Sequence, residues 1–134
     1  MKKIEDLASL ANDLIEQENF KEAYYVVMKA LEIVPEPHSA YAEATWLFAT
    51  LGDIYFSKND FEQALFAFTD AIQCPDGLGN PFIHLRLGQC QFERSNFDKA
   101  ADEFMRAYMA EGKEIFQDED PKYFQFLKSR SKVY

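Results

Sequence analysis

The residues that could ligate a metal or supply a nucleophile are two histidines and two cysteines. His38 and His84 lie far apart in the sequence and lack the four-residue spacing of a helical metal site. Cys90 has no histidine at a spacing typical of a thiolate pair, and the sequence leaves open whether the fold brings His84 close to it. We therefore predict that Cys74 and Cys90 are packing residues in a reducing compartment, His84 a partly buried structural imidazole and His38 a solvated capping residue.

An acidic run at residues 118–120 is the other place where a cation could bind. The alternation and spacing of a calcium loop are missing, and the run directly precedes Pro121, which is favoured at the first position of a helix. Helix capping therefore explains the run better. No glycine-rich phosphate loop follows a strand pattern. We predict no catalytic residue, no metal and no cofactor, and hence a protein that is not an enzyme.

Length and charge narrow the class of protein. A chain of 134 residues with 48% hydrophobic residues predicts a single domain over residues 1–134 with a continuous core. The net charge of −9 argues against nucleic acid and anionic lipid as partners and is compatible with a basic protein. Residues 1–80 hold 14 acidic and 5 basic residues, whereas residues 81–134 hold 9 of each. The chain lacks a signal-peptide pattern and a membrane-spanning apolar run, so we expect a cytoplasmic protein with no membrane partner.

Three segments are near copies of one another, at residues 19–23, 60–64 and 96–100. Each begins with Asn or Asp, which can cap a helix, and continues with apolar residues at spacings of three, four and three. The second copy, for example, runs Phe61, Ala64, Phe68 and Ala71. These spacings place the four side chains on one helical face.

A second amphipathic helix is expected before each copy. Gly52 lies twelve residues before Ala64, and Gly88 lies twelve residues before Ala100. A glycine inside a helix costs about 1 kcal/mol relative to alanine, so its recurrence at one register indicates a close helix crossing.

These motifs resemble the tetratricopeptide repeat family, whose pattern is W-x2-L-G-x2-Y followed by A-x3-F, an alanine and a proline. The best-matching unit carries Phe48, Leu51, Gly52, Tyr55, Ala64, Phe68, Ala71 and Pro75. The resemblance implies an all-α fold, a right-handed α-solenoid of three helix-turn-helix hairpins with a C-terminal capping helix. The hairpins would span about residues 4–37, 38–76 and 81–112, with a capping segment at 113–134.

Two departures from the pattern lead to further predictions. The extra residues at 36–43 indicate a lengthened first helix in the middle hairpin, capped near Ser39. The turn-rich segment 75–81 is expected to be the most mobile joint. A closing helix is predicted over residues 120–130, where apolar residues follow the acidic run and Lys128 and Arg130 complement the helix dipole.

In the family the first helices of the hairpins line a concave groove. Carried over to this chain, the predicted partner-binding residues are Asn12, Trp46, Asp53, Phe56, Phe82, Arg86, Gln89 and Phe92. Some members clamp a terminal carboxylate with lysines, asparagines and an arginine. Only Asn12 and Arg86 match that clamp here, and Asp53 would repel a carboxylate.

The resemblance implies a non-enzymatic scaffold for a protein or peptide partner. Three classes stay open: a general adaptor or co-chaperone, an immunity protein that neutralises a co-encoded bacterial toxin, and a secretion chaperone that holds a segment of an exported protein. The genes that neighbour the coding sequence would separate the three.

Overall fold

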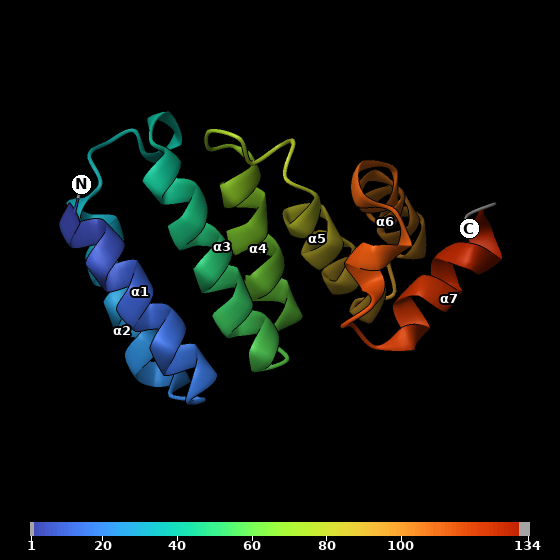
Figure 1. Ribbon diagram of the computed structural model, residues 1–134, viewed down its shortest axis with the longest axis horizontal. Coiled ribbons are helices and arrows are strands. Elements are labelled where there is room, and N and C mark those ends of the chain that lie inside the picture. Colours follow the sequence, from blue (N-terminus) through green and yellow to red (C-terminus); the bar gives the residue numbers. More distant parts are fainter. Residues whose placement is uncertain (1, 132–134) are drawn as a thin grey trace. The chain divides into compact units, whose positions relative to one another are not determined.

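The computed structural model describes residues 2–131, and within that range every regular element is a helix (Figure 1). The elements are α1 (Lys2–Glu16), α2 (Phe20–Ile33), η1 (His38–Ala40), α3 (Ala42–Ser57), α4 (Phe61–Ile72), α5 (Pro81–Glu93), α6 (Phe97–Glu111), η2 (Lys113–Phe116) and α7 (Pro121–Arg130), where η denotes a 3-10 helix. The pairs α1–α2, α3–α4 and α5–α6 pack as hairpins, which confirms the predicted fold class. None of the helices in the described range is both long and apolar enough to cross a membrane.

The chain forms two compact units, Met1–Gly79 and Asn80–Tyr134. Unit 1 contains the first two hairpins, and unit 2 contains the third hairpin with η2 and α7. The boundary falls inside the turn-rich segment 75–81 that the sequence singled out. A single domain over residues 1–134 and a mobile joint stay predictions.

The turn inside each hairpin has the same backbone geometry. Glu18, Asn59 and Ser95 each have φ near +60°, in the left-handed region that ends many helices. The residue that follows each of them donates its N–H to the carbonyl five positions earlier, over 2.8–2.9 Å. The three near-identical segments therefore begin after three equivalent turns, as a structural repeat requires.

The predicted side-chain caps at these turns are found once. Asp60 accepts a hydrogen bond from the backbone N–H of Gln63 at 3.2 Å. Asn19 and Asn96 instead donate their amides to Gln17 and Gln91 and make no side-chain cap.

Gly52 and Gly88 lie where the two helices of a hairpin cross closely, as predicted. A Cβ added to Gly52 would lie 2.7 Å from the ring of Phe68, and one added to Gly88 would lie 2.5 Å from the ring of Phe104. Each glycine is therefore the point where α4 or α6 rests a fully buried aromatic ring on the preceding helix. This close approach explains why the helices tolerate the poor propensity of glycine.

The first hairpin solves the same packing problem with other residues. Ala11 and Val27 occupy the registers of the glycine and the aromatic, and both are fully buried. A larger residue on the first helix is matched by a smaller one on the second. This compensation explains why the first repeat has the most degenerate sequence.

The extra length of the middle hairpin takes a different form from the one predicted. Residues 38–40 form the separate 3-10 turn η1, and Tyr41 is extended, with φ −125° and ψ 129°. Helix α3 then begins at Ala42 and not near Ser39. The ring of His38 packs 5.9 Å from that of Phe48, so the turn folds back on α3 and does not prolong it.

Residues 74–77 are held in place by hydrogen bonds within unit 1. The hydroxyl of Thr45 donates to the carbonyl of Pro75 at 2.8 Å, and the N–H of Gly77 donates to the carbonyl of Cys74 at 3.0 Å. Gly77 is buried, and a Cβ there would lie 2.0 Å from the carbonyl oxygen of Ala71. Only glycine fits this turn at the C-terminal end of α4.

The closing helix predicted over residues 120–130 is confirmed by α7. Asp120 caps it by accepting the N–H of Lys122 at 3.0 Å, and Pro121 occupies its first turn. Leu127 is fully buried in the core of unit 2, and Arg130 pairs with Asp98 of α6. Helix α7 thus covers the apolar face of the last hairpin, which an exposed repeat end requires.

Candidate partner-binding surfaces

In unit 1 the first helices of the hairpins are α1 and α3, which contact each other. Trp46 is 52% exposed on α3, although its neighbours Thr45 and Leu47 are buried. Thr50, one turn on, donates its hydroxyl to the carbonyl of Trp46 at 2.8 Å. Asn12 is exposed on α1. An exposed indole on a well-packed helix is the kind of side chain that dominates protein interfaces.

Two further predicted residues lie towards the end of α3. Asp53 is half-buried, one turn after Thr50. Phe56 is also half-buried, because its ring packs edge-on against Phe61 at 5.4 Å between centroids. The more accessible aromatic anchor of unit 1 is therefore Trp46 and not Phe56.

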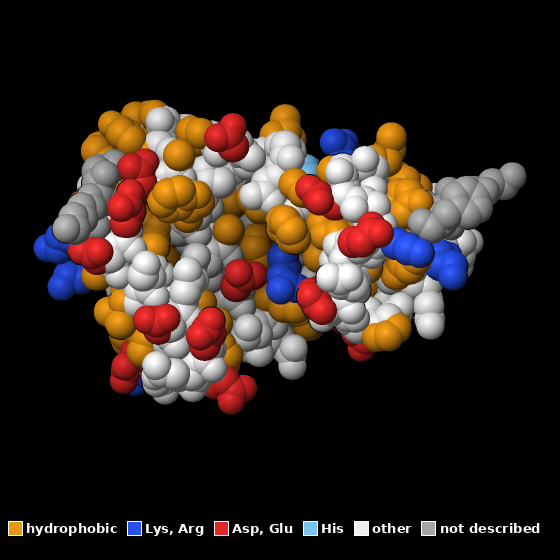
Figure 2. Space-filling view, viewed as in Figure 1, with side chains coloured by type: hydrophobic (Ala, Val, Ile, Leu, Met, Phe, Trp, Pro, Cys, Tyr) orange, Lys and Arg blue, Asp and Glu red, His pale blue; other side chains and the backbone are white. Residues whose placement is uncertain are grey.

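The net negative charge of the chain lies in unit 1. Because residue 80 is Asn, the net charge of −9 for residues 1–80 lies wholly within Met1–Gly79. Figure 2 shows acidic side chains spread over α1 and α3, whereas acidic and basic side chains mix over unit 2. Trp46 is thus an exposed aromatic residue of the unit that carries the net negative charge.

In unit 2 the first helix is α5, and only one of its predicted residues is freely exposed. Phe82 is 61% exposed in the first turn of the helix. Asn80 caps that turn by accepting the N–H groups of Phe82 and Ile83 at 2.9 and 3.3 Å. The cap holds Phe82 at the start of a rigid helix.

The predicted role of Gln89 is corrected by the structure. Its side chain is fully buried, donating to Glu119 at 2.6 Å and accepting from Arg86 at 2.8 Å. Arg86 also donates to Glu119 at 2.8 Å. The carboxylate of Glu119 therefore binds both of these polar side chains of α5, and Gln89 cannot reach a partner while it does so.

Phe92 is likewise engaged within unit 2. Its ring packs edge-on against Phe97, Tyr123 and Phe126 at 5.5, 5.4 and 5.2 Å. The ammonium group of Lys122 lies 5.8 Å from the Phe92 centroid. Helix α7 thus uses the aromatic face that the sequence assigned to a partner.

Glu93 anchors α7 beside this cluster. Its carboxylate accepts a hydrogen bond from the Tyr123 hydroxyl at 3.1 Å and pairs with Lys122 at 2.7 Å. Burial, followed by the charge of Glu93, raises the pKa of Tyr123 well above its ordinary value. The phenol therefore stays neutral and acts as a hydrogen-bond donor.

His84 and both cysteines are buried. His84 is buried in α5, more deeply than the partial burial predicted, and its Nδ1 lies 2.6 Å from Glu103 of α6. Cys74 and Cys90 are buried free thiols, as expected of packing residues. Burial, followed by the charge of Asp70, raises the pKa of the Cys74 thiol. Among the described residues, no three His, Cys, Asp or Glu side chains converge as metal ligands would.

Local sequence patterns did not predict the role of Glu119. The acidic run before Pro121 predicted helix capping, and Asp120 fulfils that role. Its neighbour Glu119 reaches back to Arg86 over 33 positions of sequence. Such a pairing depends on how the loop returns to α5, which no local pattern reports.

Comparison with known proteins yields neither a matching family model nor a matching curated protein. Solved structures do match. The first tetratricopeptide domain of Spaghetti (RPAP3), bound to the HSP90 peptide SRMEEVD, has a TM-score of 0.74 at 16% identity, covering 96% of this chain and 90% of that one. The chain has the tetratricopeptide-repeat fold.

Two further tetratricopeptide-like matches support this assignment of fold. The Yersinia enterocolitica type III secretion chaperone SycD, in complex with a peptide of the translocator YopD, has a TM-score of 0.75 at 14% identity, over 96% of this chain and 92% of that one. The Sgt2 tetratricopeptide domain from Aspergillus fumigatus has a TM-score of 0.68 at 17% identity, over 96% and 77% of the two chains. At such identities the likeness is one of fold.

Proposed function

We propose that this tetratricopeptide-fold protein is a non-enzymatic scaffold that binds a segment of a protein partner on the first helices of its hairpins. The observation that carries the proposal is the exposure of Trp46 and Phe82, at 52% and 61%, on α3 and α5. Large aromatic side chains on rigid helices lose little conformational entropy on binding and are favoured as hot spots. The peptide complexes of two proteins with the same fold support this reading.

The net negative charge of unit 1 favours some classes of partner over others. The net charge of −9 favours a basic segment, which it would attract during encounter, over an acidic tail. Arg86, one of the two residues that match the family's carboxylate clamp, is held by Glu119. We therefore propose recognition of a basic or apolar segment and not of a terminal carboxylate.

A secretion chaperone is the second candidate. It is favoured by the likeness to SycD, which extends over 92% of that chaperone. Both this candidate and an immunity protein are special cases of the same scaffold, with an exported protein or a basic toxin as the partner. A translocator gene, a toxin gene or neither beside the coding sequence would choose among them.

The test uses matched variants within one unit. A partner is first isolated from the native host with the immobilised full chain, and its affinity is then measured by calorimetry. Trp46→Ala on α3 is compared with Phe66→Ala on α4, because the two side chains are similarly exposed, at 52% and 57%. We expect Trp46→Ala to weaken binding by about 2 kcal/mol or more, mainly through faster dissociation, and Phe66→Ala to have little effect.

Electrostatic steering is tested separately. Asp53→Lys should slow association and reduce its dependence on salt. Asp60 is unsuitable for this purpose, because its carboxylate caps α4 and its loss would weaken the helix. If Trp46→Ala and Phe66→Ala, both folded by circular dichroism, bound the partner with equal affinity, Trp46 would not be the anchor. The second helices would then be the next surface to test.

A further inference from the structure

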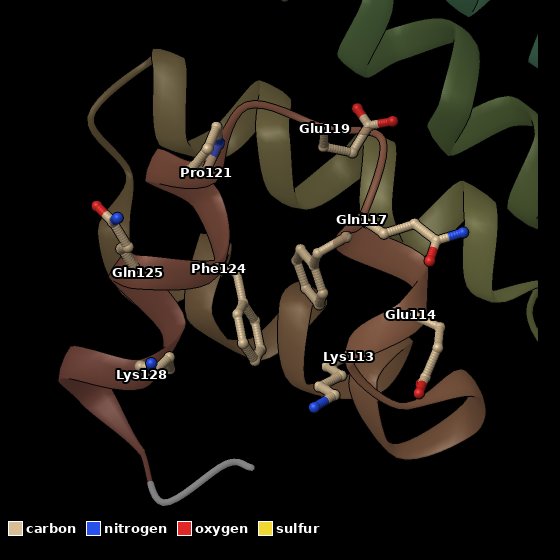
Figure 3. A pocket seen from close by; sticks show the side chains of 9 residues that line it. Lys113, Glu114, Gln117, Glu119, Pro121, Phe124, Gln125 and Lys128 are labelled. Atoms are coloured by element: carbon tan, nitrogen blue, oxygen red, sulfur yellow. The ribbon is translucent and has the colours of Figure 1, made fainter.

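Unit 2 contains a pocket that neither the repeat pattern nor the proposed function uses. It lies between η2 and α7 and has a volume of about 530 Å³, within the range of small-ligand pockets (Figure 3). Its apolar lining comes from Phe116, Pro121 and Phe124. Such a volume suits one large side chain with its neighbours and not a whole helix.

The aromatic lining is held in place from several sides. The rings of Phe116 and Phe124 lie 5.1 Å apart, and Tyr108 of α6 stacks on Phe124 at 6.3 Å. The pairing of Glu119 with Arg86 fixes the loop between η2 and α7. A pocket built on fixed rings loses little conformational freedom when a side chain enters.

The charges that line the pocket favour an anion. Lys113 from η2 and Lys128 from α7 are exposed, and Figure 3 shows them towards the end of the pocket away from Glu119. The negative charge of Glu119 is offset by its ion pair with Arg86. Among the residues that line the pocket, only Glu114 then opposes the positive charges of the two lysines.

We propose that this pocket docks an aromatic side chain of a protein partner that carries an acidic residue next to it in sequence. The ring would pack edge-on or offset against Phe116 and Phe124, an arrangement that aromatic pairs prefer. The adjacent carboxylate would lie between the ammonium groups of Lys113 and Lys128. This inference does not rest on the proposed function, because the pocket shares no residue with the first helices.

The experiment is a nuclear magnetic resonance titration of the full-length, ¹⁵N-labelled protein. The probes are three blocked dipeptides: acetyl-Phe-Glu-amide, acetyl-Phe-Lys-amide and acetyl-Ala-Glu-amide. We expect acetyl-Phe-Glu-amide to shift the amide signals of residues 113–117 and 121–128 in a saturable way. The other two probes should bind at least about fivefold more weakly, since each lacks one of the two interactions.

Matched charge reversals identify the site. The double variant K113E/K128E should weaken binding of acetyl-Phe-Glu-amide by about fivefold to tenfold, as the loss of two exposed ionic contacts implies. The control is K99E, which reverses an exposed lysine of α6 outside the pocket. All of these lysines are exposed, so the variants should keep the fold, and unchanged spectra elsewhere would verify it.

Several results would overturn the inference. Equal affinity for acetyl-Phe-Glu-amide and acetyl-Phe-Lys-amide would remove the role of the lysines. Shifts confined to α3 or to the first turn of α5 would place the site elsewhere. Absence of saturable shifts at millimolar probe would show that the pocket does not dock this class of side chain.

Discussion

Replacing Gly88 with alanine probes the close crossing of α5 and α6. In an open helix this change should stabilise by about 1 kcal/mol, because alanine is the better helix former. Here the new methyl group would lie 2.5 Å from Cδ1 and 2.6 Å from Cε1 of Phe104. The two carbons cannot approach so closely, so either the ring or the helix must move.

The surroundings of Phe104 make movement costly. Its ring is fully buried and packs against Phe116, Tyr123 and Phe126 at 5.6, 5.8 and 6.2 Å. Overpacking of a tight core costs about 1–3 kcal/mol, and this site should lie at the upper end. After subtraction of the gain in helix propensity, we expect Gly88→Ala to destabilise unit 2 by about 2 kcal/mol.

The assay is urea unfolding followed by circular dichroism, with the fluorescence of Trp46, the single tryptophan, as a reporter for unit 1. The control is Gly79→Ala, where nothing lies within 4 Å of the added methyl, and we expect a change below about 0.5 kcal/mol. A second variant, Phe104→Leu, should rescue Gly88→Ala in part. The double variant should be more stable than the sum of the single effects by about 1 kcal/mol, because a smaller side chain makes room for the methyl.

The first hairpin provides the natural precedent for this rescue, since Ala11 and Val27 occupy the same registers. If Gly88→Ala stabilised the protein, or if the double variant were strictly additive, the glycine would not be required by the crossing. The three hairpins would then not share one mode of packing at these registers.

Three further predictions concern unit 2 and the thiols. Truncation after Asp118 removes α7 and the acidic partner of Gln89, so we expect a loss of several kcal/mol in urea unfolding, or aggregation by light scattering. An intact melting temperature in a monodisperse truncated protein would contradict this. Because the pKa of Tyr123 is raised in the folded state, its contribution to stability is present below about pH 10 and is lost as the pH rises above it. Unfolding midpoints between pH 8 and 11 should therefore fall less steeply for Tyr123→Phe than for the parent. Replacement of Cys74 and Cys90 with alanine should preserve partner binding, and the raised pKa of the Cys74 thiol should make its alkylation at pH 8 slow until the protein is unfolded.

The repeat architecture could be predicted from local patterns alone. Helical periodicity identified the packed faces, and the twelve-residue interval from Gly52 and Gly88 to the next alanine predicted close crossings. The same reasoning located α7, because Asp120 and Pro121 are local start signals and the apolar residues that follow need a covering partner. Features of this kind follow from residues that lie within one hairpin or one helix of each other in the sequence.

Tertiary structure decided which aromatic and polar side chains remain available. The sequence could not distinguish Trp46, which is exposed, from Phe92, which α7 covers, because both lie on the expected face of a first helix. Gln89 is buried because the loop before α7 returns to α5 and brings the carboxylate of Glu119 to it. Long-range pairing of this kind depends on the path of the chain between the elements. Helical periodicity fixes which face of a helix a residue occupies, but only the folded chain determines what covers that face.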